Sequence, residues 1–177
     1  MTDGWSSNVS PLDTERILRT LTNHRVRFVL VGGVAAIVHG FSGSTFDLDA
    51  VPDVGTANLN RLGRTLLELG AVVYADPSRR DLAADGKPPE ADGFGYTAEG
   101  LRNEAVWHLT STAGMVDIAR AIDGVGGYRD LSRLKRTVFG ITIEVASLDH
   151  IIASKRAVAR PKDLRLLSEL ERLRDEQ

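Results

Sequence analysis

The chain has 177 residues, of which 42% are hydrophobic and 26% charged, so it is long enough to bury a core and has the composition of an average soluble domain. Its net charge of −2 excludes nucleic-acid binding through overall positive charge, so any such surface must be local. The absence of cysteine excludes disulfides, thiolate chemistry and zinc–thiolate sites. A polar N-terminus and the lack of a long apolar run predict a cytoplasmic protein with no membrane segment.

The first part of the chain alternates helical and strand patterns. Apolar residues recur at helical spacing after Pro11, whereas short β-rich runs bounded by glycine indicate buried strands. The expected elements are a tail at 1–11, a helix from 12 to 21, a strand at 28–31, a short helix at 34–39, a strand at 45–51, a helix at 59–69 and a strand at 72–74.

The second part begins with a stretch rich in proline and glycine, which predicts a long loop over 76–104, of the kind that covers active sites. The elements expected beyond it are a hairpin of 106–110 and 115–119, a turn at 124–127, a helix at 131–138, a strand at 141–145 and helices at 148–159 and 162–174. The whole pattern predicts an α/β (α+β) fold, with a mixed sheet flanked by helices and a small helical part at the C-terminus. We expect a catalytic domain over 12–146, completed by the helices of 147–177.

Two aspartates stand on one face of the strand expected at 45–51. Asp47 and Asp49 alternate with apolar residues, so their carboxylates point the same way. Carboxylates that close repel unless a cation lies between them or one is protonated. Because Mg²⁺ takes oxygen ligands and keeps phosphates in its shell, the pair predicts a seat for a metal–triphosphate. The alternative is the solvated face of an edge strand.

A glycine pair precedes this strand. At Gly32-Gly33 backbone amides can approach phosphate oxygens, and a helix that starts just after them favours anions. Ser44 and Thr45 add hydroxyl donors beside the aspartates. Taken alone, the glycines fit an ordinary strand-to-helix turn equally well, but the order of glycines, helix and acidic strand favours nucleotide binding.

Two segments carry a resemblance to a known family. GGVAAIVHGFSGSTFDLDAVPD (32–53) resembles the signature of the DNA polymerase β-like nucleotidyltransferases, and ASLDHIIASKRAVARPKDLRLLSEL (146–170) resembles the C-terminal half of the AbiEii and MenT type of bacterial toxin. In that type a lysine lies on the penultimate helix and an Arg-x-Lys-Asp segment opens the last. The resemblance spans roughly 28–53 and 140–173 and implies the nucleotidyltransferase fold.

The resemblance also implies roles for individual residues. Asp47 and Asp49 would bind Mg²⁺, or Mn²⁺, and Gly32 and Gly33 would cradle the triphosphate of a nucleoside triphosphate substrate. The C-terminal members of the site would be a lysine that neutralises phosphate charge (Lys155), a carboxylate that completes the site (Asp163) and a lysine that contacts phosphate or nucleic acid (Lys162).

A third carboxylate is common in the superfamily, and Asp117, which lies among apolar residues, is the best match. It would bind a second metal or accept a proton, or it is simply a surface residue of the hairpin. Many relatives carry an arginine where this chain has Gly43, which leaves substrate choice open. A group of basic residues fits either a solvated helix face or contacts to a nucleic-acid backbone: Arg129, Arg133, Lys135 and Arg136.

By resemblance, the function would be transfer of a nucleoside monophosphate to the 3′ end of tRNA, by a toxin that is paired with an antitoxin protein. A second hypothesis keeps the chemistry but makes the acceptor a protein or a small hydroxylated molecule. The short C-terminal part counts mildly against a small molecule, which we expect to need a larger second domain. A third hypothesis is a non-catalytic binding module that keeps this fold.

Overall fold

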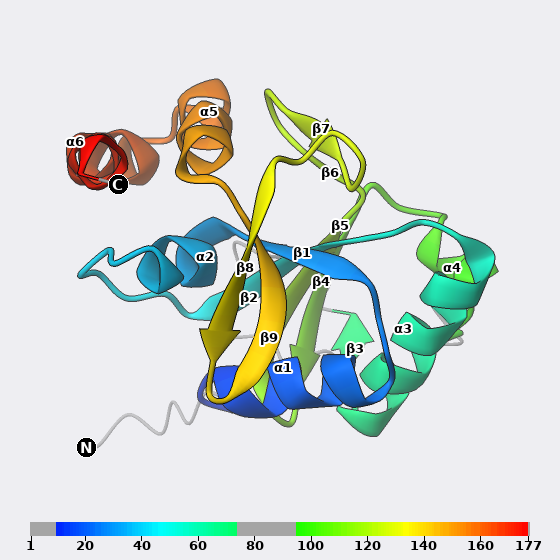
Figure 1. Ribbon diagram of the computed structural model, residues 1–177. Helices are drawn as coiled ribbons and strands as arrows, with labels where there is room; N and C mark the ends of the chain where they lie inside the picture. The colour runs from blue at the N-terminus through cyan, green and yellow to red at the C-terminus, as the bar shows by residue number, and fades with distance from the viewer. Residues whose placement is uncertain (1–9, 74–94, 177) are drawn as a thin grey trace, which may run out of the picture.

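The computed structural model of the chain describes residues 10–73 and 95–176. None of the helices in these two segments combines the length and the apolar character needed to span a membrane. The fold brings the expected elements together around one mixed sheet (Figure 1), so the α/β class and the flanking helices predicted from the sequence are confirmed.

The described residues form a seven-stranded sheet in the order β3-β4-β5-β2-β1-β9-β8 and a separate two-stranded ribbon of β6 and β7. The pairs β1–β9 and β2–β5 are parallel, whereas the other neighbours in the sheet are antiparallel. The strands are β1 (Phe28–Val31), β2 (Asp47–Pro52), β3 (Val72–Val73), β4 (Val106–Ser111), β5 (Gly114–Ala119), β6 (Ala121–Ile122), β7 (Gly126–Gly127), β8 (Arg133–Val138) and β9 (Ile141–Ala146).

Six helices accompany the sheet in the described segments. They are α1 (Thr14–Asn23), α2 (Gly32–Val38), α3 (Thr56–Glu68), α4 (Ala98–Leu101), α5 (Leu148–Val158) and α6 (Pro161–Asp175). Helix α1 contacts α3, while α5 contacts both α2 and α6. Figure 1 shows α5 and α6 beyond α2, away from α1, α3 and α4. Helix α5 therefore stands next to α2, the short helix that begins with the glycine pair.

Local sequence explains the elements that frame the site. Strand β1 is apolar throughout and fully buried, as expected for a central strand with neighbours on both sides. Strand β2 buries Leu48 and Ala50 and leaves Asp47 and Asp49 half-buried, so the alternation predicted for this strand is confirmed. Ser147 caps α5 by accepting a hydrogen bond from the amide of His150.

The prediction of a helix over 131–138 is wrong, because residues 133–138 form the edge strand β8, which pairs with β9. A two-residue turn joins the strands, and both of its residues, Phe139 and Gly140, have positive φ angles of 52° and 73°. Such turns match the natural twist of a β-hairpin. The basic residues of this segment thus lie on an exposed sheet edge, where lysine and arginine discourage pairing with other chains.

Three other predictions need a smaller correction. Within the loop predicted over 76–104, residues 76–94 lie outside the described residues, and Ala98–Leu101 form the short helix α4. The short helix predicted from residue 34 begins two residues earlier, so Gly32 and Gly33 are its first two residues. The turn predicted at 124–127 lies within the ribbon of β6 and β7.

Candidate active site

Three carboxylates meet where β2 and β5 lie side by side. Asp49 and Asp117 are direct partners in the parallel register, and Asp47 precedes Asp49 on the same face of β2. One oxygen from each of the three lies within 4.8 Å of the others. The fold therefore brings the two predicted metal ligands together with the third carboxylate, and such an all-oxygen group fits a hard divalent cation.

The ionisation of Asp49 is strongly perturbed by its surroundings. Burial, together with the neighbouring charges of Asp47 and Asp117, raises its pKa to about 7, although Lys155 and the amide of Gly33 act in the opposite direction. Without a cation, a proton on Asp49 relieves the repulsion within the group. This is the behaviour expected of carboxylates that are arranged to share a positive charge, and it supports the fit of a cation to these residues.

The glycine pair is required by the side chains that pack on it. A Cβ atom on Gly32 would lie 2.1 Å from Oδ2 of Asp49, and one on Gly33 would lie 2.7 Å from the Thr45 side chain. Gly32 also has a φ of +67°, which favours glycine. Both glycines line the cleft, and they let β2 and Thr45 approach α2 closely. Their role in cradling a triphosphate stays a prediction.

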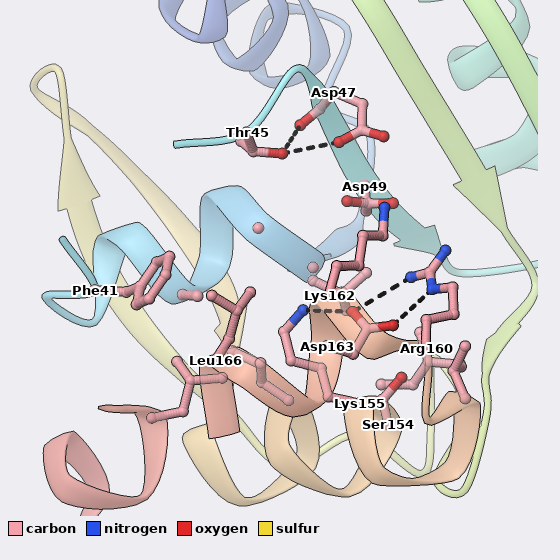
Figure 2. A pocket seen from close by; sticks show the side chains of 18 of the residues that line it. Phe41, Thr45, Asp47, Asp49, Ser154, Lys155, Arg160, Lys162, Asp163 and Leu166 are labelled. Carbon is pink, nitrogen blue, oxygen red and sulfur yellow. Dashed lines mark hydrogen bonds and ion pairs between the residues drawn. The ribbon is translucent and has the colours of Figure 1, made fainter. Parts of the chain in front are cut away.

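Thr45 and Ser44 also line the cleft. The hydroxyl of Thr45 donates a hydrogen bond to Oδ1 of Asp47 over 2.8 Å (Figure 2). This bond orients the Asp47 carboxylate at the entrance to β2. Thr45 thus positions a predicted metal ligand, and its role as a donor to phosphate stays a prediction.

The opposite wall comes from α5 and α6. Asp163 has only 3% of its side chain exposed and accepts hydrogen bonds from Lys155 over 3.2 Å and from Arg160 over 2.6 Å (Figure 2). Burial alone would raise the pKa of Asp163, but these two cationic donors lower it below its usual value. Asp163 is therefore an ionised anchor that holds two cations in the cleft.

Arg160 was not among the site residues predicted from the sequence. Its hydrogen bond to Asp163, and to a smaller extent the charges of Asp49 and Asp47, raise the pKa of its guanidinium. The signal for it was the Arg-x-Lys-Asp segment, in which only the lysine and the aspartate were assigned roles. The turn at Ala159, which adopts a left-handed conformation, and Pro161 at the start of α6 place Arg160 between the two helices.

Carboxylates and cations face a common cleft of about 640 Å³. Lys162 and Arg165 of α6 also line it, and Lys162 has no hydrogen-bond or ion-pair partner among the described residues. By contrast, the basic residues on and before β8 do not line the cleft, and Arg133 stacks on the ring of Tyr128 at 4.4 Å. The cleft thus has one acidic wall and one basic wall.

One end of the cleft is apolar, and the sequence did not predict it. Phe41 and Leu166 lie at the end away from Arg160 (Figure 2), and Phe46, with 69% of its surface exposed, lines the cleft beside Asp47. A Cβ atom on Gly43 would lie 2.1 Å from the Phe41 ring, so no side chain fits there without moving the ring. The Phe41 ring therefore occupies the space beside position 43, where the resemblance predicts an arginine.

Comparison with solved structures identifies the architecture. The lincosamide antibiotic adenylyltransferase LnuA, bound to lincomycin, superposes with a TM-score of 0.58 and 12% identity over 93% of this chain and 99% of its own. The antibiotic-resistance factor ANT(2'')-Ia gives a TM-score of 0.53 and 13% identity, over 92% of this chain and 87% of its own. This chain has the nucleotidyltransferase fold.

The nucleotidyltransferase fold recurs in a second structure of ANT(2'')-Ia, in complex with adenylyl-2''-tobramycin, with a TM-score of 0.53 and 92% coverage of both chains. No protein-family model and no curated protein matches the sequence. These findings confirm the nucleotidyltransferase fold implied by the resemblance of residues 32–53, whereas the AbiEii and MenT toxin type stays a prediction.

Proposed function

We propose that the protein is a Mg²⁺-dependent nucleotidyltransferase that moves a nucleoside monophosphate from a nucleoside triphosphate to a hydroxyl acceptor. The observation that carries the proposal is the group of three carboxylates, Asp47, Asp49 and Asp117, opposite two cations held by Asp163 in one cleft. Asp47 and Asp49, with Asp117 beside them, would hold Mg²⁺ or Mn²⁺, which supplies charge neutralisation for the triphosphate.

The residues of the chain supply positioning and electrostatics. Lys155 and Arg160 would neutralise phosphate charge, because their hydrogen bonds to Asp163 hold both of them in the cleft. The acceptor oxygen forms a bond to the α-phosphorus, the bond from that phosphorus to the bridging oxygen breaks, and pyrophosphate leaves. We assign Asp117 two roles, as a ligand of the cation beside Asp49 and as the group that accepts the hydroxyl proton.

For the acceptor we propose the 3′ end of tRNA, with the protein acting in the cytoplasm as the toxin of a toxin–antitoxin pair. Lys162 and Arg165 support this acceptor, because they add positive charge to the same cleft beyond the two cations bound by Asp163. A chain with a net charge of −2 can attract phosphates only where its cations are gathered in this way.

A small hydroxylated molecule is the second candidate acceptor. LnuA binds lincomycin and is covered over 99% of its length by this chain, so a fold of this size has room for such a ligand without a large second domain. Phe41 and Phe46, which both line the cleft, offer aromatic surface on which an apolar molecule would pack.

The test is transfer of radiolabel from each of the four α-labelled nucleoside triphosphates, with Mg²⁺, to total tRNA and to a panel that includes lincomycin and tobramycin. Asp47→Ala and Asp49→Ala serve as inactive controls. Label on tRNA that both substitutions abolish would establish the function and name the nucleotide. Label only on a small molecule would favour the second candidate, and no transfer to any acceptor from folded protein would overturn nucleotidyl transfer and favour the binding module.

A further inference from the structure

A histidine outside the cleft contacts the third carboxylate. His108 lies on β4, directly opposite Asp117 of β5 in the antiparallel register, and its Nδ1 is 2.9 Å from Oδ2 of Asp117. The Asp117 side chain is 15% exposed and that of His108 38%. An ionised carboxylate can only accept, so with Asp117 ionised the proton of this hydrogen bond is on Nδ1. His108 does not line the cleft, so it reaches the site through Asp117.

The contact matters because Asp117 stands in an unfavourable field. It is the register partner of Asp49, and the two carboxylates lie within 4.8 Å of each other, so like charges on them repel. An aspartate side chain has few constraints of its own, so repulsion favours rotamers that turn Asp117 away from Asp49. A donor anchored on the neighbouring strand opposes that rotation.

We propose that His108 is a positioning residue that holds Asp117 within the carboxylate group through its Nδ1–H hydrogen bond. The proposal rests on the proposed function only for its effect on turnover, since divalent-cation binding can be measured without nucleotide. Partners that orient a ligating carboxylate typically change metal affinity or activity about 10–100-fold when they are removed. A residue of β4 would thereby affect cation binding and turnover without lining the cleft.

The test compares substitutions that keep or remove the donor. His108→Asn can place an amide N–H near the position of Nδ1, whereas His108→Leu has no donor, and His108→Val serves if the leucine variant does not fold. Val106→Thr is the matched control, because Val106 lies two residues away on the same face of β4 and is exposed. Asp117→Ala defines the full loss.

Mn²⁺ binding to the metal-free chain, followed by electron paramagnetic resonance, is the first readout. We expect His108→Leu to weaken Mn²⁺ binding about 10–100-fold, approaching Asp117→Ala, while His108→Asn and Val106→Thr stay within about threefold of wild type. In the transfer assay kcat should fall in parallel, with little change in the KM of the acceptor. Thermal unfolding of each variant checks that it is folded.

The outcomes separate the two proposals. Equal Mn²⁺ affinity and kcat in wild type and His108→Leu, with loss in Asp117→Ala, would overturn the role of His108 and leave the proposed function standing. Equal losses in His108→Leu and His108→Asn would also overturn it, because the hydrogen-bond donor would not be the cause. A wild-type chain that neither binds Mn²⁺ nor transfers nucleotide would overturn the proposed function itself.

Discussion

At the scale of single residues, the environment of Asp49 disfavours its charged form, because the residue is buried beside two other carboxylates. Its pKa of about 7, against an ordinary value of 3.8, means that the folded chain binds a proton between these pH values that the unfolded chain has released. The free energy of unfolding of the metal-free protein therefore contains a contribution from Asp49 that is present below pH 4 and is lost as pH rises through 7.

The first prediction follows from that sign. In the presence of a chelator, Asp49→Asn should be more stable than wild type at pH 8, by up to about 4 kcal/mol, and the difference should vanish near pH 4. Urea unfolding at several pH values measures it, with the exposed Asp123→Asn as a control. Mg²⁺ should raise the unfolding temperature of wild type at pH 8 but not that of Asp49→Asn. Parallel pH profiles for the two chains would contradict the raised pKa.

Asp163 carries the opposite prediction, because its buried carboxylate is ionised and bound to two cations. Asp163→Ala leaves Lys155 and Arg160 facing each other without a counter-charge, so it should cost about 3 kcal/mol at pH 7 and abolish transfer. Since the pKa of Asp163 is lowered, its contribution is present at neutral pH and is lost only in acid.

The control for Asp163 is Glu171→Ala, which breaks an ion pair to Arg156 between the same two helices, at the surface. An exposed pair of this kind contributes at most about 1 kcal/mol. Urea unfolding of both variants compares them directly. Similar losses of stability in the two would show that burial of Asp163 confers no special importance on its contacts.

At the scale of elements, the first residues of α2 lie close to β2. Gly32 permits this approach because it has no side chain to meet Asp49. We expect Gly32→Ala to lower transfer on the order of 100-fold, because the new methyl group displaces the Asp49 carboxylate. Gly140→Ala is a matched control: its φ of +73° resembles the +67° of Gly32, yet among the described residues no atom beyond its chain neighbours lies within 4 Å of the place that the new methyl group would take. Both variants should lose stability from backbone strain, Gly32→Ala the more because its methyl group also meets Asp49, while only Gly32→Ala should lose activity.

The same elements show what local sequence can predict. Strand β2 was predictable because one face is buried, so Asp47 and Asp49 stand out against Leu48 and Ala50. Strand β8 was not, because an exposed edge strand has no buried face, and its burial alternates only weakly. The Phe139-Gly140 turn that defines the hairpin uses a phenylalanine at positive φ, which sequence patterns do not favour.

The site was predictable to the extent that it is local. Asp47 and Asp49 need only the two-residue period of a strand, whereas the place of Asp117 beside Asp49 depends on the β2–β5 register. The contact of His108 with Asp117 depends on a second register, and Arg160 depends on a turn between two helices. Contacts between distant segments leave no periodic signal in the sequence, so the role of His108 emerged only from the fold. Asp117 was named from the resemblance, and Arg160 lay in the Arg-x-Lys-Asp segment without an assigned role.

For the whole molecule, the decisive property is how a nearly neutral chain distributes its charge. The net charge is −2, yet four cationic residues line the cleft: Lys155, Arg160, Lys162 and Arg165. If tRNA is the acceptor, its phosphates displace counterions when they enter this field, so binding must weaken as salt concentration rises. A small acceptor without phosphates releases no such counterions, so the two acceptors differ in this property.

Salt dependence of the acceptor KM therefore distinguishes the candidates. With tRNA, a plot of log(1/KM) against log[KCl] should fall steeply, and Lys162→Gln should reduce the slope by about one, because one phosphate contact is lost. Arg64→Gln, an exposed substitution on α3, should leave the slope unchanged. A flat plot that Lys162→Gln leaves unchanged would contradict phosphate contacts to the acceptor. The cationic residues of the cleft would then bind only the triphosphate.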